Sequence, residues 1–104
     1  MHPLNVLGDP VRRAVLEHLT AGEAPAGEIA GVVGGRFGIS HPAVSQHLRV
    51  LREAGFTHVR AQGQQRLHSI APQGLMAAAE WLEQFRPFWS AALDRLGAEL
   101  ARKV

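Results

Sequence analysis

Cysteine is absent from this chain of 104 residues, so disulfide bonds and thiolate metal sites are both excluded. No run of about 18 apolar residues is present that would cross a membrane as a helix. The first ten residues, MHPLNVLGDP, lack the basic start and the long apolar run of a secretion signal. These absences, with a length typical of one domain, predict a soluble, cytoplasmic, single-domain protein.

Charge is modest overall, with a net +2, but it is unevenly distributed. Residues 36 to 68 contain five arginines and one acid, Glu53, for a local net charge of +4, whereas the rest of the chain carries −2. A basic middle within a mildly acidic frame indicates a local site for a polyanion. A solvated surface is the plainer alternative, because charge clusters usually have no other role.

Two helices are predicted in the first third of the chain. The first starts after Asp9, a good N-cap, and ends before Gly22, with the apolar stripe Val11, Val15, Leu16 and Leu19. Residues 2–7 form a short helical or extended lead-in to it. The second helix covers APAGEIAGVV and is expected to end before Gly34 and Gly35.

A third helix begins after Ser40 and stops at Gly55, and it has two distinct faces. The core face carries Val44, Leu48 and Leu51. The opposite face carries Pro42, Ser45, Gln46 and Arg49. Arginine, glutamine and serine are side chains that pair with base edges, and a helix N-terminus suits a phosphate. An ordinary amphipathic helix with a solvated polar face is the alternative.

Alternating apolar and polar residues then predict a β-hairpin with strands at 57–61 and 65–70. A final helix is predicted over 75–102, with a break near Gln84 because Pro87 lies inside its pattern. Two short helices and a tight turn, followed by a β-ribbon, describe a winged helix-turn-helix. The predicted fold is therefore mainly α with a small β-hairpin, as one domain over 1–104. Its helix-turn-helix spans about 25–55, its wing 57–70, and its long C-terminal dimerisation helix 75–102.

The same segments resemble the ArsR-type, or arsenic-repressor-like, transcriptional regulators over essentially the whole chain. LGDPVRRAVLEHL is similar to the first-helix signature of that family, and FGISHPAVSQHLRVLREAGF to its turn and recognition helix. VRAQGQQRLHSIAP resembles the wing, and WLEQFRPFWSAALDRLGAEL the last helix of a subgroup without the founding metal sites. Departures are the segment VVGG, which looks like one extra helical turn, and Gln64 and His68, where the family often has Arg and Tyr.

The resemblance implies a homodimeric regulator, usually a repressor, that binds double-stranded DNA with its third helix in the major groove. The positions that it implies for DNA binding are Ser40, Pro42, Ser45, Gln46, His47 and Arg49 on the helix, with Arg60 and Arg66 on the wing. The predicted DNA-binding residues also include Ala43, which is small enough to lie against a thymine methyl group, and His41 and Gln64. Arg60 and Arg66 are both expected on the solvated side of the ribbon, against the phosphate backbone or in the minor groove.

A dimer is also expected from the residues themselves, because the apolar stripe of the last helix is too long for the small core to cover. The predicted dimer interface consists of Leu4, Leu7, Leu82, Phe85, Phe88, Trp89, Leu93, Leu96 and Leu100. A two-fold dimer would place two recognition helices about one DNA turn apart, so the binding site should be an inverted repeat.

Metal sensing is not expected, and no cofactor is predicted. The last helix has acids but no histidine. His58 and His68 could face each other across a three-residue turn, but exposed wing histidines are the plainer reading. No catalytic motif or phosphate loop is present, so an enzyme is not expected. The alternatives are a metal- or small-molecule-responsive repressor with an unknown effector, or a helix-turn-helix that docks proteins without binding DNA.

Overall fold

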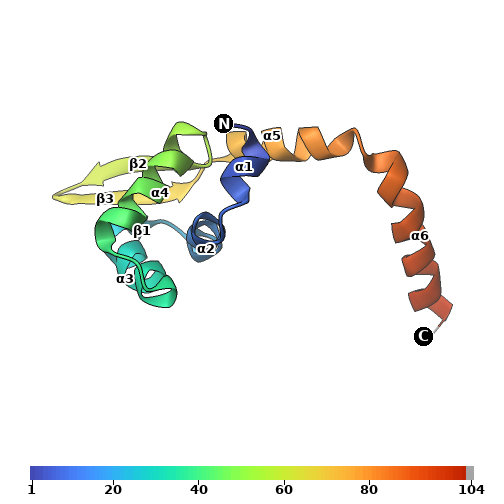
Figure 1. Cartoon of the computed structure of the whole chain (residues 1–104), viewed down its shortest axis with the longest axis horizontal. Helices are drawn as coiled ribbons and strands as arrows, with labels where there is room; N and C mark the ends of the chain where they lie inside the picture. Colours follow the sequence, from blue (N-terminus) through green and yellow to red (C-terminus); the bar gives the residue numbers. More distant parts are fainter. Residues whose placement is uncertain (103–104) are drawn as a thin grey trace.

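The computed structural model describes residues 1–102, so the predicted domain end at 104 lies outside the described part (Figure 1). The helices and strands follow one another as α1 Pro3–Leu7, α2 Pro10–Leu19, β1 Ala24–Pro25, α3 Ala26–Phe37, α4 His41–Glu53, β2 Thr57–Gln62, β3 Gln65–Ile70, α5 Pro72–Glu83 and α6 Arg86–Arg102. The core lies where α2, α3 and α4 meet, and Phe56, Ile29 and Leu51 are its largest fully buried side chains.

The start of α2 is fixed by its cap, as the sequence predicts. The Asp9 carboxylate accepts hydrogen bonds from the amides of Val11 at 2.8 Å and Arg12 at 3.2 Å. Pro10 occupies the first turn, where a missing amide hydrogen costs nothing. All four residues of the predicted stripe are buried, so α2 is anchored in the core. The lead-in forms the short helix α1.

Helix α3 is longer than predicted, because it continues through Gly34 and Gly35 to Phe37. It stops at Gly38, whose φ of 65° is left-handed and suits glycine. Gly34 lies inside the helix where the backbone of the turn comes close. A Cβ at this position would lie 3.0 Å from the carbonyl oxygen of Ile39. This glycine therefore permits close packing rather than marking the helix end.

Helix α4 matches its prediction at both ends. The Ser40 hydroxyl accepts a hydrogen bond from the Ala43 amide at 3.2 Å, and Gly55 beyond the last turn has a φ of 80°. The three residues predicted for the core face, Val44, Leu48 and Leu51, are buried. The burial of this face leaves the opposite face of α4 at the surface.

The wing is an antiparallel hairpin of β2 and β3, joined by a turn of Gly63 and Gln64. The prediction missed a third strand, β1, which pairs with the other edge of β3 to give the order β1-β3-β2. Strand β1 has only two residues, too few to show an alternating pattern. It ties the wing to the segment between α2 and α3.

The C-terminal segment breaks between α5 and α6, as Pro87 predicts. Helix α5 packs against α1, where the rings of His2 and Trp81 meet edge to face at 5.3 Å. Helix α6 then turns away, so that the wing and α6 project from opposite ends of a molecule 54 Å long (Figure 1). No residue of α6 is buried within the chain. Within residues 1–102, no helix is both long and apolar enough to span a membrane.

Candidate DNA-binding surface

The polar face of α4 is presented to solvent beside the wing. Ser45, Gln46 and Arg49 are exposed, and so are Ser40, His41 and Pro42 at the capped end. Ala43 and His47 are half-buried. The Nε atom of Arg49 lies 3.4 Å from a carboxylate oxygen of Glu53, one turn further along. An exposed pair at this distance is weak, so the guanidinium can exchange its partner for a base or a phosphate.

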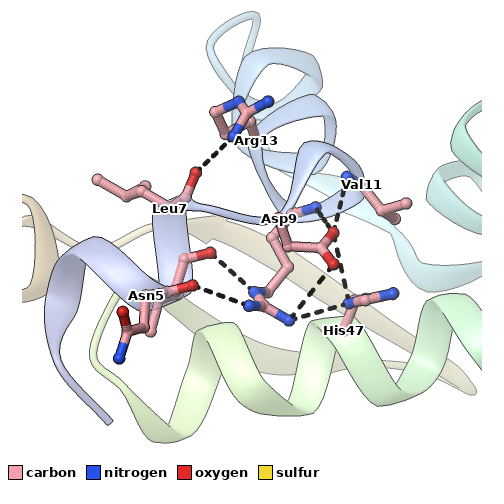
Figure 2. Close-up of polar contacts among 8 residues, drawn as sticks. Asn5, Leu7, Asp9, Val11, Arg13 and His47 are labelled. Atoms are coloured by element: carbon pink, nitrogen blue, oxygen red, sulfur yellow. Dashed lines mark hydrogen bonds and ion pairs between the residues drawn. The ribbon is translucent and has the colours of Figure 1, made fainter.

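His47 differs from the other predicted positions, because it faces α2 rather than open solvent (Figure 2). Its Nδ1 atom lies 3.3 Å from Nη1 of Arg12 and 3.9 Å from a carboxylate oxygen of Asp9. Arg12 also donates from Nε to the carbonyl of Val6 at 2.8 Å and from Nη2 to that of Asn5 at 3.0 Å. One arginine thus joins the end of α1, the start of α2 and the recognition helix.

The same cluster keeps Asp9 ionised. Partial burial tends to raise the pKa of Asp9, but the amide hydrogen bonds from Arg12 and Val11 and the charges of His47 and Arg12 outweigh it, so the pKa is lowered. The cap is therefore charged at neutral pH, where it also complements the dipole of α2. Asp9 is recognisable as a cap from the sequence, but the role of Arg12 is not, because His47, one of its partners, is 35 positions away.

Arg60 and Arg66 do not share one side of the wing, and the expectation that they would is wrong. The register pairs Arg66 with Ala61 and Arg60 with Leu67. Directly opposed residues point to the same face, and adjacent residues point to opposite faces. The two arginines therefore lie on opposite faces, with Arg66 towards α4, where it lines a pocket with Arg49 and Arg52.

Arg60 is held by Glu23, which lies just before β1. Its Nε atom donates to Glu23 Oε2 at 2.9 Å, and Nη2 donates to Oε1 of the same carboxylate and to Gln62 Oε1 at 3.0 Å. This contact lowers the pKa of Glu23, chiefly through the hydrogen bond from Arg60. Arg60 is exposed, as predicted, but it already has an acidic partner. Gln64 is exposed at the wing tip.

His58 and His68 do not face each other, because the turn has two residues rather than three. His58 pairs with Ser69, and His68 with Val59. His58 is exposed, but His68 is only 6% exposed, which corrects the view of two exposed wing histidines. Over residues 1–102, no three His, Asp or Glu side chains gather where they could hold a metal ion.

Burial of His68 makes stability depend on pH. Desolvation, aided by the charges of Arg52 and Arg66, lowers the pKa of His68 below its ordinary value. The unfolded chain then takes up a proton at a higher pH than the folded chain does. Stability should be full above the ordinary histidine pKa, near 6.5, and should fall as the pH drops towards the lowered value.

A His68→Leu variant checks this dependence, since leucine has a similar volume and does not titrate. Urea unfolding at pH 7.5 and pH 5 should show a smaller loss of stability for the variant than for the unchanged chain. The other five histidines are common to both proteins and cancel in the comparison. Equal losses would show that His68 does not resist protonation in the folded state.

The predicted dimer residues fall into two groups. Phe88, Leu93, Leu96 and Leu100 are at least half exposed, and Phe85 is 39% exposed. Leu4, Leu7, Leu82 and Trp89 are half-buried, and Leu7 packs against the core. Trp81 of α5, which the sequence places alongside the apolar stripe, is 38% exposed, and Met76 of the same helix is exposed as well. Exposed apolar side chains along two consecutive helices form a surface that soluble monomers rarely show.

Comparison with known proteins agrees with this geometry. The family described as Helix-turn-helix domain matches residues 7–60. The HTH-type transcriptional regulator Rv2034 of Mycobacterium tuberculosis is 39% identical over 87 residues, which cover 84% of this chain and 75% of that protein. The transcriptional repressor SdpR of Bacillus subtilis is 33% identical over 79 residues, covering 76% of this chain and 83% of that one.

A solved structure extends the agreement to nearly the full length. The crystal structure of a possible transcriptional regulator for arsenical resistance has a TM-score of 0.70 and 38% sequence identity, and it covers 95% of this chain and 96% of its own. Its fold and the relatives above point to the regulation of transcription rather than to catalysis. The chain therefore belongs to the helix-turn-helix transcriptional regulators of the ArsR, or arsenical-resistance, type and is not an enzyme.

Proposed function

We propose that this chain acts as a homodimeric repressor that binds an inverted repeat in double-stranded DNA at the nucleoid. The observation that carries the proposal is the exposed polar face of α4, with its capped N-terminus, beside a basic wing. An α-helix fits the major groove, where each base pair presents a distinct pattern of donors and acceptors. Repression is proposed because the relative SdpR is described as a transcriptional repressor.

Within this arrangement, Gln46 and Arg49 contact base edges. Both are exposed on the face opposite to the buried Val44, Leu48 and Leu51. The N-terminal residues of the second helix of a helix-turn-helix contact base edges. In α4 this end carries Ser40, His41, Pro42, Ala43 and Ser45. His47 has a different role, because its side chain contacts Arg12 and Asp9 and so holds α4 in position instead of contacting a base.

The dimer brings two such helices to one duplex. The exposed apolar residues of α5 and α6 supply a surface for a second copy, with Leu4 and Leu7 of α1 at its edge. One module alone makes few contacts, and joining two raises affinity through effective concentration. A two-fold axis in the protein requires a two-fold axis in the DNA, which is an inverted repeat.

Replacement of Arg49 by alanine tests the base contacts. The variant should lose about 1–3 kcal/mol of binding free energy on the preferred duplex and should relax base preference at one position of each half-site. The measurement is a selection of bound sequences from random duplexes, followed by titration of the best site. A sequence preference identical to that of the unchanged protein would contradict the assignment of Arg49.

Glu53→Ala is the matched control, because it removes the ion pair with Arg49 and leaves the guanidinium in place. It should leave the sequence preference unchanged.

Titrations at several salt concentrations also separate DNA binding from protein docking, since contacts to phosphates make affinity fall steeply with salt. A protein-docking module would show no such fall on duplex DNA.

A further inference from the structure

A pocket of about 250 Å³ lies between the recognition helix α4 and strand β3 of the wing. Its lining includes Ser45, Arg49 and Arg52 from α4 and Arg66 and His68 from β3. Three of its lining residues are arginines, and none is acidic. We propose that this pocket seats one backbone phosphate of the bound DNA, gripped by Arg52 from the helix and Arg66 from the wing.

The two arginines are available for this contact. Within residues 1–102, neither Arg52 nor Arg66 forms an ion pair or a side-chain hydrogen bond with an acid. Arg49 and Arg60 differ, because they are paired with Glu53 and Glu23. Like charges that converge without an acid between them repel one another, and a phosphate oxyanion relieves that repulsion.

The position of the pocket indicates which phosphate of the DNA would bind in it. The inference rests on the proposed function, in which α4 enters the major groove, and it takes the wing to reach the adjacent minor groove, one of the two positions expected for it. One sugar–phosphate strand separates those two grooves, so it must pass between helix and wing. The pocket lies in that crevice, with one wall from α4 and one from β3. A phosphate of this strand is thus the group that the docking geometry brings to it.

The hairpin register is what directs Arg66 into the crevice. Arg66 lies opposite Ala61 and shares its face, whereas Arg60 points to the other face and contacts Glu23. A three-residue turn would have changed this pairing and moved Arg66 relative to α4. The two wing arginines therefore have separate tasks, and only Arg66 contributes to the phosphate pocket.

The burial of His68 beside the two arginines is a second observation that supports an anion in this pocket. It is 6% exposed, and its Nδ1 atom is buried with no hydrogen-bond partner. The charged groups that face it are Arg52 from α4 and Arg66 on its own strand, with Arg49 also on the pocket wall. Its strand neighbours Ala24 and Val59 do not titrate. A phosphate would offset the arginine charges, so DNA binding should raise the pKa of His68.

The test replaces single phosphates of the duplex by neutral methylphosphonates, one position at a time. For the unchanged protein, one position in each half-site, at the strand between the two grooves, should weaken binding at least about tenfold. For Arg52→Gln and for Arg66→Gln, the same replacement should cost clearly less than in the unchanged protein, because the phosphate has already lost one of its two partners, and for the double variant it should cost less than about twofold. Circular dichroism and the unfolding midpoint establish that each variant is folded.

Arg60→Gln is the matched control, because it removes the same charge from the other face of the same ribbon. It should keep the full methylphosphonate penalty at that position. The full penalty could persist in both pocket variants, or it could disappear equally in Arg60→Gln. Either result, with the duplex still bound, would refute the phosphate site but not the proposed function. Absence of any duplex binding by the unchanged protein would instead refute the proposed function, and the pocket with it.

A free small phosphate is the other source of the same oxyanion, and a separate titration distinguishes it. Inorganic phosphate is added at constant ionic strength while the His68 ring is followed by NMR. The DNA proposal expects no saturable shift of His68 at low millimolar phosphate, and a raised pKa of His68 only in the duplex complex. Saturation by inorganic phosphate, with release of the duplex, would overturn the proposal in favour of a small-molecule site.

Discussion

Replacing Leu93 by glutamate should abolish tight DNA binding without altering any residue that faces DNA. Leu93 is 61% exposed on α6, and Leu96 and Leu100 follow it on the same face. A second copy of the chain covers these side chains in the proposed dimer, and a buried unpaired carboxylate there is strongly unfavourable. Loss of the second module should weaken duplex binding by at least about 100-fold.

The measurement combines the molar mass from light scattering with titration of an inverted-repeat duplex. The variant should be monomeric at micromolar concentration, where the unchanged protein should be a dimer. Ala98→Glu is the matched control, because it adds the same charge at an exposed position on the opposite side of α6. It should keep both the dimer and the affinity. An unchanged protein that stays monomeric yet binds one half-site tightly would refute the dimer.

Elements with a local cause were predictable from the sequence. Asp9 and Ser40 cap their helices, and each acts on amides within three residues. The break before α6 follows from Pro87, which cannot continue a helix from its interior but suits a first turn. The polar face of α4 could be identified because the opposite face needed three apolar residues at helical spacing.

Features that depend on contacts across the chain were not predictable. The extension of α3 through Gly34 depends on how closely the turn approaches, which no local pattern encodes. The faces of Arg60 and Arg66 depend on whether the turn has two or three residues. The partner of Arg60, Glu23, is 37 positions away. The exposed face of α4 was thus predictable from the sequence, but the pairing of side chains around it was not.

Arg12 is the clearest example of such a long-range contact. In the sequence it is one of two adjacent arginines on the polar side of α2. In the structure its side chain is 12% exposed and it bonds to residues of α1 and α4, as far as 35 positions away. Arg13 is exposed and makes one hydrogen bond, to the carbonyl of Leu7 at 2.8 Å. The two neighbours should therefore differ sharply in their effect on stability.

Arg12→Met should lower the free energy of unfolding by about 3 kcal/mol, because it leaves a half-buried carboxylate and two carbonyl groups without their charged donor. Methionine keeps the length of the side chain, so lost packing is a minor part of the change. Arg13→Met is the control and should cost less than about 1 kcal/mol, since its donor is exposed to water. Both variants are measured by urea unfolding at the same protein concentration, so that dimerisation contributes equally to the two values. Equal effects of the two substitutions would contradict the role of Arg12 in joining α1, α2 and the recognition helix.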